Sequence, residues 1–323
     1  MFKRRQKEEL LRLFYAGDLH GSRVCWKKFI NAAAHYPADA LVMGGDLTGK
    51  ALVPIVRRGD GSHLARVIGE EREAHGATEL EELEAAIATN GMYPTIVDEA
   101  EAERLRTDSA HREQVFERAL LGELTLWVEF ADERLAGTDT RAYVIPGNDD
   151  PWSVDAILES GTAVDACDEQ MRVVGAHEMI SFGYSNRTPW DTPRELDEDE
   201  IYTRLKALTD QLENPSGAIF NIHVPPRDSS LDTAYEVDEE LRYVTKGGRP
   251  HEIATGSSAV RQIIEEVQPL LSLHGHIHES KGVAKIGRTV AINPGSDYVS
   301  GHLDGCLVHL ARERIVNQYL VSG

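Results

Sequence analysis

The chain has 323 residues, of which 41% are hydrophobic and 27% charged, and its 34 basic and 54 acidic residues give a net charge of −20. This composition is typical of a globular protein and excludes collagen-like, low-complexity and disordered chains. A surface so negative repels phosphate backbones and anionic lipids, so nucleic acid is an unlikely partner and we expect no membrane partner, unless the charge is locally reversed.

Cysteine usage and the N-terminal segment indicate the compartment. Cys25, Cys167 and Cys306 are far apart and odd in number, which is typical of a reducing compartment without a disulfide framework. The N-terminal segment is basic, with the run Lys3-Arg4-Arg5, but no apolar stretch of signal-peptide type follows it, and no window has the length of a membrane span. We therefore expect a cytoplasmic protein.

The first predicted elements are strand, helix and strand. Residues 11–16 form an apolar run that ends in Gly17-Asp18-Leu19-His20. Ser22 is a good N-cap for the helix that follows. Residues 40–43 predict a second strand, which runs into Gly44-Gly45-Asp46. Such an order begins a parallel α/β sheet.

Residues 50–137 interrupt this pattern and are rich in Glu, Arg and Ala. Apolar side chains recur at helical spacing over residues 80–87 and 116–135, which predicts two or more inserted helices. The insertion either only covers the sheet edge or forms a cap or dimerisation arm near the site. We expect one domain over residues 1–323, with a helical insertion at 50–137 after the second strand, and a homo-oligomer is left open.

The α/β pattern resumes in the second half of the chain. Strands are predicted at 141–146 and 218–222, a β-hairpin at 172–182 and an acidic helix at 194–213. Residues 227–256 are predicted to form a long loop, and Ser258 to cap a helix that Pro269 ends. A strand at 270–273 and four short β runs at 283–286, 289–292, 306–310 and 315–321 complete the chain.

Polar side chains follow five of these strands at the point where each ends. In open α/β sheets the ligand site lies at the carboxyl ends of strands, so these side chains are expected to converge. They are Asp18, His20, Asp46, Asn148, His223, His276 and His278.

The chemistry of this set suits metal ions. Carboxylate oxygen, amide oxygen and imidazole nitrogen together favour Mn, Fe or Zn, and the lack of thiolates excludes a structural zinc finger. Asp46 can bridge two ions with its two oxygens, and His276 and His278 can serve two adjacent ions. Two divalent metal ions about 4 Å apart would clamp a phosphoryl oxygen and generate a bridging hydroxide. They would also reverse the local charge, so that an acidic protein can bind a phosphate ester.

In this order the motifs resemble those of the calcineurin-like metallophosphoesterase superfamily. That family's blocks are Asp-x-His, Gly-Asp, Gly-Asn-His-Asp/Glu, a lone His and Gly-His-x-His. They stand here as Asp18-Leu19-His20, Gly45-Asp46, Gly147-Asn148-Asp149-Asp150, His223 and Gly275-His276-Ile277-His278. The runs His223-Val224-Pro225-Pro226 and Asn293-Pro294-Gly295-Ser296 are most similar to bacterial and archaeal phosphoesterases related to the Icc type.

The resemblance implies an α/β fold, a two-sheet β-sandwich flanked by helices, with the site at the strand tips. It assigns Asp18, His20, Asp46 and His278 to a first metal ion, and Asp46, Asn148, His223 and His276 to a second. The implied activity is that of a dinuclear metal-dependent phosphoesterase acting on a small phosphoester, with diesters favoured. A metal-bridging hydroxide would attack phosphorus in line, and His223 would help to stabilise the developing charge.

The third block departs from the family pattern, because Asp149 stands where a His is usual. Two nearby cations should lower the pKa of this carboxyl, which makes it a poor general acid. The enzyme then acts on esters that need little protonation, another residue such as His251 supplies the proton, or the site binds without hydrolysing. Asp150 matches the acidic position that closes the block, and we expect it to orient its neighbours.

Further residues have weaker signals. Arg227 and Arg249 could contact a substrate phosphate. Trp190 or Tyr184 could stack on a nucleobase. His274 is expected to be structural.

Three alternatives to an esterase remain. A metal-binding scaffold on the same fold would use the insertion as a partner surface. A nuclease is disfavoured by the net charge and by the lack of basic runs beyond Lys3-Arg4-Arg5. A Rossmann or P-loop nucleotide-binding protein is disfavoured because neither Gly-rich motif occurs.

Overall fold

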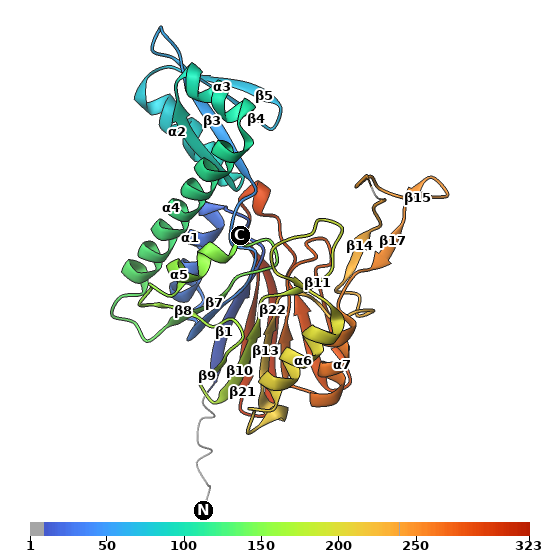
Figure 1. Ribbon diagram of the computed structural model, residues 1–323. Coiled ribbons are helices and arrows are strands. Elements are labelled where there is room, and N and C mark those ends of the chain that lie inside the picture. The colour runs from blue at the N-terminus through green and yellow to red at the C-terminus, as the bar shows by residue number, and fades with distance from the viewer. Residues whose placement is uncertain (1–9, 239) are drawn as a thin grey trace, which may run out of the picture.

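Two six-stranded sheets form the body of the molecule (Figure 1). The computed structural model describes residues 10–238 and 240–323, so the run Lys3-Arg4-Arg5 lies outside the described residues. The first sheet has the order β22-β21-β1-β2-β7-β8, with strands Arg314–Ser322, Asp304–Ala311, Leu11–Ala16, Ala40–Gly44, Arg141–Ile145 and Val164–Ala166. The second has the order β19-β20-β18-β13-β10-β9, with strands Gly282–Ile286, Thr289–Asn293, Leu271–Leu273, Ile219–Ile222, His177–Phe182 and Met171–Val174.

The sheets pack face to face through apolar side chains that alternate along their strands. Leu13 and Val308 of the first sheet lie in one cluster with Met179, Ile219 and Leu273 of the second, and all five are fully buried. Burial of such side chains stabilises each by about 1.5–3 kcal/mol, so this interior holds the two sheets together. The predicted sandwich is therefore present, and the predicted hairpin is the antiparallel pair β9 and β10.

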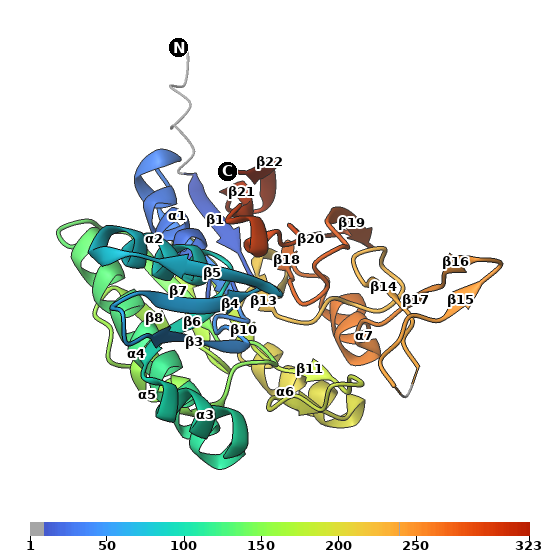
Figure 2. The same ribbon diagram turned by 90° about the horizontal axis from the view of Figure 1, so that it is seen from above.

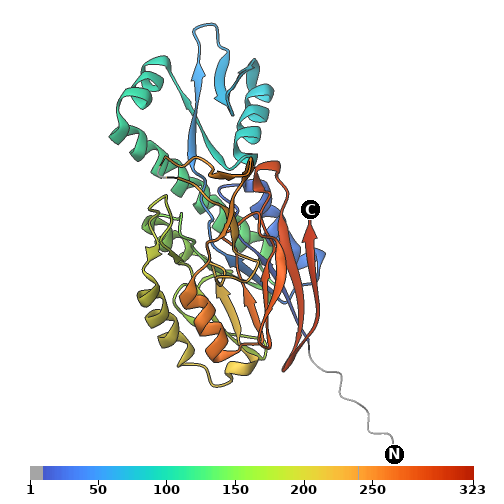
Figure 3. The same ribbon diagram turned by 90° about the vertical axis from the view of Figure 1, so that its right-hand side faces the viewer.

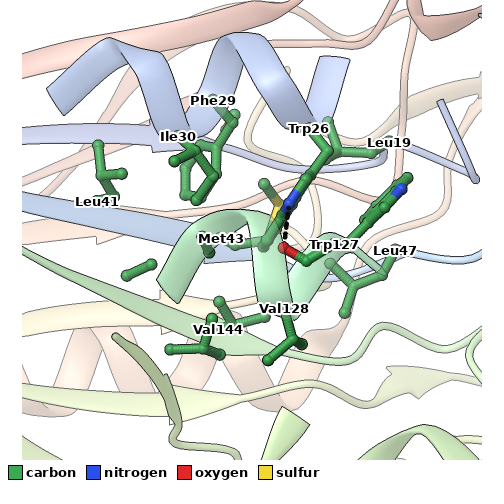
Figure 4. Packing of buried hydrophobic residues seen from close by; sticks show 14 of the residues in the cluster. Leu19, Trp26, Phe29, Ile30, Leu41, Met43, Leu47, Trp127, Val128 and Val144 are labelled. Carbon is green, nitrogen blue, oxygen red and sulfur yellow. Dashed lines mark hydrogen bonds between the residues drawn. The ribbon is translucent and has the colours of Figure 1, made fainter. Parts of the chain in front are cut away.

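Helices cover the outer face of the first sheet. They are α1 (Arg23–His35), α4 (Ser109–Leu135) and α5 (Asp155–Leu158). Trp26 of α1 stacks on Trp127 of α4 with ring centroids 5.1 Å apart, and Trp26 Nε1 donates a hydrogen bond to the Trp127 carbonyl oxygen at 2.8 Å (Figure 4). Ser22 is the N-cap of α1, as predicted, and its side chain accepts from the amide of Cys25.

Two further helices, α6 (Glu198–Thr209) and α7 (Ser258–Val267), cover the outer face of the second sheet, on the left of the body in Figure 3. Two boundaries differ from the prediction. The N-cap of α7 is Ser257, not Ser258, because its hydroxyl accepts from the amide of Val260 at 3.1 Å. The acidic helix begins only at Glu198, because residues 195–196 form the short strand β12, which pairs with β11 (Ser185–Asn186).

The insertion at 50–137 contains helices over both predicted stretches, 80–87 and 116–135, but it also contains a sheet that was not predicted. After β2 the chain forms a four-stranded sheet of order β5-β4-β3-β6, with strands Glu70–Ala74, His63–Val67, Ala51–Arg57 and Met92–Val97. Helices α2 (Gly76–Thr89) and α3 (Glu99–Thr107) accompany it. This part projects from the body at the top of Figure 1 and faces the viewer in Figure 2. The sequence signal for these strands is weak because β5 is almost entirely polar, and because Pro54 in β3 and Pro94 in β6 disfavour a strand.

The predicted loop at 227–256 is also more ordered than expected. Strand β14 (Thr233–Tyr235) pairs with β17 (Glu252–Ala254), and β15 (Thr245–Lys246) pairs with β16 (Arg249–Pro250). These pairs form an arm that extends from the body (Figure 1). Gly247 and Gly248 make its turn with φ values of 61° and 79°, a conformation that glycine pairs favour in hairpins.

The described helices include none with both the length and the apolar character needed to cross a membrane.

Candidate metal centre

Parallel strands bring the predicted ligands to one edge of the sandwich. β1, β2 and β7 run parallel in the first sheet, and β13 runs parallel to β18 in the second. Asp18 and His20 follow β1, and Asp46 follows β2. The amide of Asp18 donates to the carbonyl of Gly45 and that of His20 to the carbonyl of Asp46, both at 2.9 Å, so the two loops are fastened together.

Hydrogen bonds also connect the second sheet to these two loops. His223, directly after β13, donates from Nδ1 to the carbonyl oxygen of Gly44 at 2.7 Å. The amide of Gly275 donates to the carbonyl of His223 at 2.9 Å. The amide of His276 donates to Asp18 Oδ1 at 2.9 Å. Ligands from both sheets are therefore held in one hydrogen-bonded frame.

Four of the ligand residues have a left-handed backbone, with φ values of 57° at Asp18, 41° at His20, 52° at Asp46 and 67° at His276. Residues other than glycine avoid this region, and such strain persists only where the surroundings hold it. Close packing adds a further restraint, because a Cβ on Gly275 would lie 2.3 Å from Asp18 Oδ2. This backbone conformation directs the four side chains toward the same region at the edge of the sandwich.

The first cluster consists of Asp18, His20, Asp46 and His278, whose ligand atoms all lie within 4.8 Å of one another. His20 Nε2 is 3.5 Å from Asp46 Oδ2, and His278 Nε2 is 3.6 Å from Asp18 Oδ1. The Nε2 atoms of His20 and His278 are 3.0 Å apart, which requires a proton or a metal ion between them.

The second cluster consists of Asp46, His223 and His276, again within 4.8 Å. His223 Nε2 is 3.5 Å from Asp46 Oδ1 and 2.9 Å from Asn148 Oδ1. Asp46 thus belongs to both clusters, with one carboxylate oxygen facing each.

The orientation of His223 fits a cation at this point. The carbonyl of Gly44 only accepts, so Nδ1 carries a hydrogen, and in the neutral imidazole Nε2 presents its lone pair to Asn148 Oδ1 and Asp46 Oδ1. Three electron-rich atoms that face one point repel one another unless a positive charge lies between them. Ligands about 2.1 Å from one ion lie about 3.0–3.4 Å from each other, close to the separations seen here. The buried oxygen and imidazole donors therefore suit divalent metal ions.

Burial and charge set the protonation of these groups. Burial lowers the pKa of His20 to about 3, and burial with the nearby His223 lowers that of His276 to about 4, so both imidazoles are neutral and able to bind metal. Burial disfavours the charged forms of His223 and Asp46 as well. Their mutual attraction outweighs it, raising the pKa of His223 to about 9 and holding that of Asp46 well below its usual range.

Five strand ends, from both sheets and in the order of the five sequence motifs, now meet at two clusters that share Asp46. The chain therefore has the two-sheet α/β sandwich, with the site at its strand tips, that the resemblance to calcineurin-like metallophosphoesterases implies.

Comparison with known proteins agrees with this fold. No family model matches the chain. The uncharacterized protein MJ1162 of Methanocaldococcus jannaschii is 31% identical over 153 residues, which make up 46% of this chain and 62% of that protein. One solved crystal structure, 17% identical, covers 97% of this chain and 99% of its own with a TM-score of 0.56. The TT1561 protein of Thermus thermophilus, 14% identical, covers 98% and 99% with a TM-score of 0.52.

Asp150, in the third block of the metallophosphoesterase motifs, lies behind the ligands and holds their loops. Its Oδ1 accepts from the amide and hydroxyl of Thr48 at 2.8 and 2.6 Å, and its Oδ2 accepts from the amides of Leu47 and Gly147 at 3.0 and 2.8 Å. The side chain is completely buried. These hydrogen bonds suit the orienting role expected of Asp150.

Asp149, which replaces the usual His of the metallophosphoesterase pattern, borders the pocket. It forms an ion pair with Lys50, and its Oδ2 lies 3.8 Å from His20 Nδ1. Burial and the Asp46 carboxylate raise the pKa of Asp149, and Lys50 partly opposes them. This direction is that of the metal-free protein, whereas the predicted lowering of the pKa of Asp149 depends on the charge of bound metal ions.

A cavity of about 660 Å³ opens beside the two clusters. Residues 186–190 and Thr192 form one wall, and residues of β14 and β17 contribute to another. Trp190 and Tyr235 line the cavity and are 60% and 41% exposed, so both present aromatic surface to a ligand. Arg227 also lines it, as the sequence suggested.

Other suggested residues lie elsewhere. His251 Nδ1 is 2.6 Å from Glu236 Oε2 in the arm, and neither His251 nor Arg249 is among the described residues that line the cavity. Tyr184 is buried against Phe182, so it does not offer a stacking face in the cavity. His274 is structural, as expected, because it donates from Nδ1 to the carbonyl of Ile222 at 2.9 Å.

Three residues of the site escaped prediction. Lys50 lines the cavity, Tyr298 lies 4.9 Å from the His20 ring between centroids, and Thr192 accepts a hydrogen bond from Asn148. Lys50 follows Asp46 by four residues, and this proximity was the one available signal. Tyr298 and Thr192 are in irregular segments whose position depends on tertiary contacts.

Proposed function

We propose that the protein is a dinuclear metal-dependent phosphoesterase that acts on small phosphodiesters in preference to monoesters. The observation that carries the proposal is the position of Asp46, whose Oδ2 faces His20 and whose Oδ1 faces His223. A carboxylate shared in this way would hold two cations side by side, the arrangement by which two-metal sites clamp the attacking and leaving oxygens of a phosphoryl group. The cavity beside the clusters has a volume of about 660 Å³, which is room enough for a group on each side of a phosphate.

Asp18, His20, Asp46 and His278 would hold one ion, and Asp46, Asn148, His223 and His276 the other. When bound, the ions would supply a nucleophile at neutral pH and neutralise charge on the phosphoryl oxygens.

Side chains of the protein orient the ester and partly neutralise the charge of its phosphoryl oxygens. The ammonium group of Lys50 lines the cavity and can attract a phosphoryl oxygen. The Asp149 carboxylate forms an ion pair with this ammonium group and holds it in place. In the hydrolysis, water oxygen bonds to phosphorus, the bond to the leaving oxygen breaks, and that oxygen takes up a proton. With Asp149 in place of a His, the site favours esters whose leaving group needs little protonation.

The test is hydrolysis of bis-p-nitrophenyl phosphate and p-nitrophenyl phosphate by chelator-treated protein, with Mn²⁺, Fe²⁺, Zn²⁺ or Mg²⁺ added singly. We expect at least one metal to restore cleavage, faster for the diester. Asp46→Asn should lower the rate by about 100-fold or more and reduce the bound metal, because it weakens ligation of both ions. Asp39→Asn is the matched control, since Asp39 pairs with Arg12 away from the site.

Two results would contradict the proposal. Binding of two ions without cleavage of either ester would favour a metal-binding scaffold, which the replacement of the family His by Asp149 supports. Steeply salt-dependent binding and cleavage of DNA would favour a nuclease.

A further inference from the structure

A chain of hydrogen bonds leads from Asn148 away from the metal clusters into the wall of the cavity. Asn148 Nδ2 donates to Thr192 Oγ1 at 2.8 Å, and Thr192 Oγ1 donates to Glu195 Oε1 at 2.6 Å. Glu195 is only 6% exposed, and it also accepts from the Thr192 amide at 2.9 Å and from the amide and hydroxyl of Thr188 at 2.9 and 2.5 Å. Four donors therefore converge on one carboxylate.

The chemistry of these groups determines which of them donates and which accepts in each of these hydrogen bonds. Burial opposes ionisation of Glu195, but its four hydrogen bonds outweigh burial and lower its pKa, so it is a carboxylate and accepts only. The Thr192 hydroxyl must then donate to Glu195 and offer a lone pair to Asn148. Only the amino group of the carboxamide can face that lone pair, which turns Asn148 Oδ1 toward His223 Nε2, 2.9 Å away.

The same segment forms part of the substrate cavity. Thr188, Trp190 and Thr192 all line it, and the amide of Trp190 donates to Thr188 Oγ1 at 3.2 Å. The amide of Arg194 donates to the carbonyl oxygen of Asn148 at 3.2 Å, so the segment is bound to Asn148 through backbone as well as side chain.

We propose that Thr192 and Glu195 are positioning residues for the second metal ion, orienting the Asn148 carboxamide so that its oxygen is a ligand. This inference rests on the metal centre of the proposed function. It adds a link between that ion and the wall of residues 186–192. A metal ion that binds Asn148 Oδ1 stabilises the chain of hydrogen bonds and thereby the wall that carries Trp190.

The experiment measures Mn²⁺ binding to metal-free protein by titration calorimetry and by metal content after dialysis. Thr192→Val removes the hydroxyl with little change of shape. We expect this variant to bind one of the two ions about 10–100-fold more weakly, which is the usual effect of removing a hydrogen-bond partner of a metal ligand. Binding of the other ion should not change. Glu195→Gln should act in the same direction, because its amino group can donate to Thr192 Oγ1 and compete with Asn148.

Two variants separate positioning from general stability. Thr192→Ser keeps the hydroxyl and should restore binding of both ions. Thr188→Val removes a hydrogen bond to the same Glu195 without contacting Asn148, so it should weaken binding of that ion much less than Thr192→Val does. A further readout is hydrogen exchange of the wild type, in which Mn²⁺ should slow exchange of the amides of Thr188 and Thr192.

Equal binding of both ions by the wild type and by Thr192→Val and Glu195→Gln would overturn this proposal alone. Unchanged exchange of the 186–196 amides on addition of Mn²⁺ would overturn the proposed link to the wall. A wild type that binds no second ion would overturn the proposed function along with it.

Discussion

His223 and Asp46 face each other at the centre of the site, with Nε2 and Oδ1 3.5 Å apart, and each sets the protonation of the other. Burial alone would neutralise the imidazole, but the Asp46 carboxylate outweighs it and raises the pKa of His223 to about 9. In metal-free protein a proton therefore sits where a metal ion would bind. Metal binding at this site must release that proton, so affinity for the ion rises with pH.

This pairing predicts how stability of the metal-free protein depends on pH. The folded-state pKa of His223, about 9, lies above its ordinary 6.5, so protonated His223 stabilises the fold below pH 6.5 and this contribution is lost as pH rises through 9. We expect the free energy of unfolding in urea, with chelator present, to fall over this range by on the order of a few kcal/mol. His223→Asn should show a smaller fall, and an identical fall in both proteins would contradict the assignment.

Helix α4 connects the projecting part to the body. Its first half contacts β3, β6 and α3, and its second half packs on α1 and the first sheet. At 1.5 Å per residue its 27 residues span about 40 Å, so one continuous helix reaches both regions. Trp127, which is 3% exposed and stacks on Trp26, is the largest side chain by which α4 packs on the body.

Truncation of this side chain tests the anchoring of α4. Trp127→Ala removes the stacking on Trp26 and leaves a cavity, so we expect a loss of about 3–5 kcal/mol in the free energy of unfolding. Leu126→Ala is the neighbouring control, because Leu126 is 54% exposed and should change stability by less than about 0.5 kcal/mol. Similar losses for both variants would show that α4 does not depend on this contact.

At the scale of the whole molecule, the site joins the two sheets. Asp18 and Asp46 belong to loops of the first sheet, whereas His223, His276 and His278 belong to loops of the second. An ion bound by both sets bridges the sandwich at its edge and adds a constraint that the unfolded chain lacks.

Metal ions should therefore stabilise the whole fold. A ligand that binds only folded protein adds about 2.7 kcal/mol at a concentration 100-fold above its Kd, so thermal unfolding should move up by several degrees on addition of Mn²⁺ and return on chelation. Asp46→Asn should show a smaller shift, because Asp46 takes part in both clusters. An equal shift in the variant would place the stabilising ion elsewhere.

The parallel strands and the polar residues at their ends are predictable from the sequence, because both are local patterns and the carboxyl ends of parallel strands lie at one edge of a sheet. The sequence therefore identified the side chains that meet in the two clusters, from Asp18 to His278. Tertiary contacts, in contrast, establish the left-handed backbone at Asp46, the pairing of Lys50 with Asp149 and the hydrogen bonds from Asn148 to Glu195. These features join residues that are distant in sequence or lie in irregular loops, and no periodic pattern along the chain encodes which of them pack together.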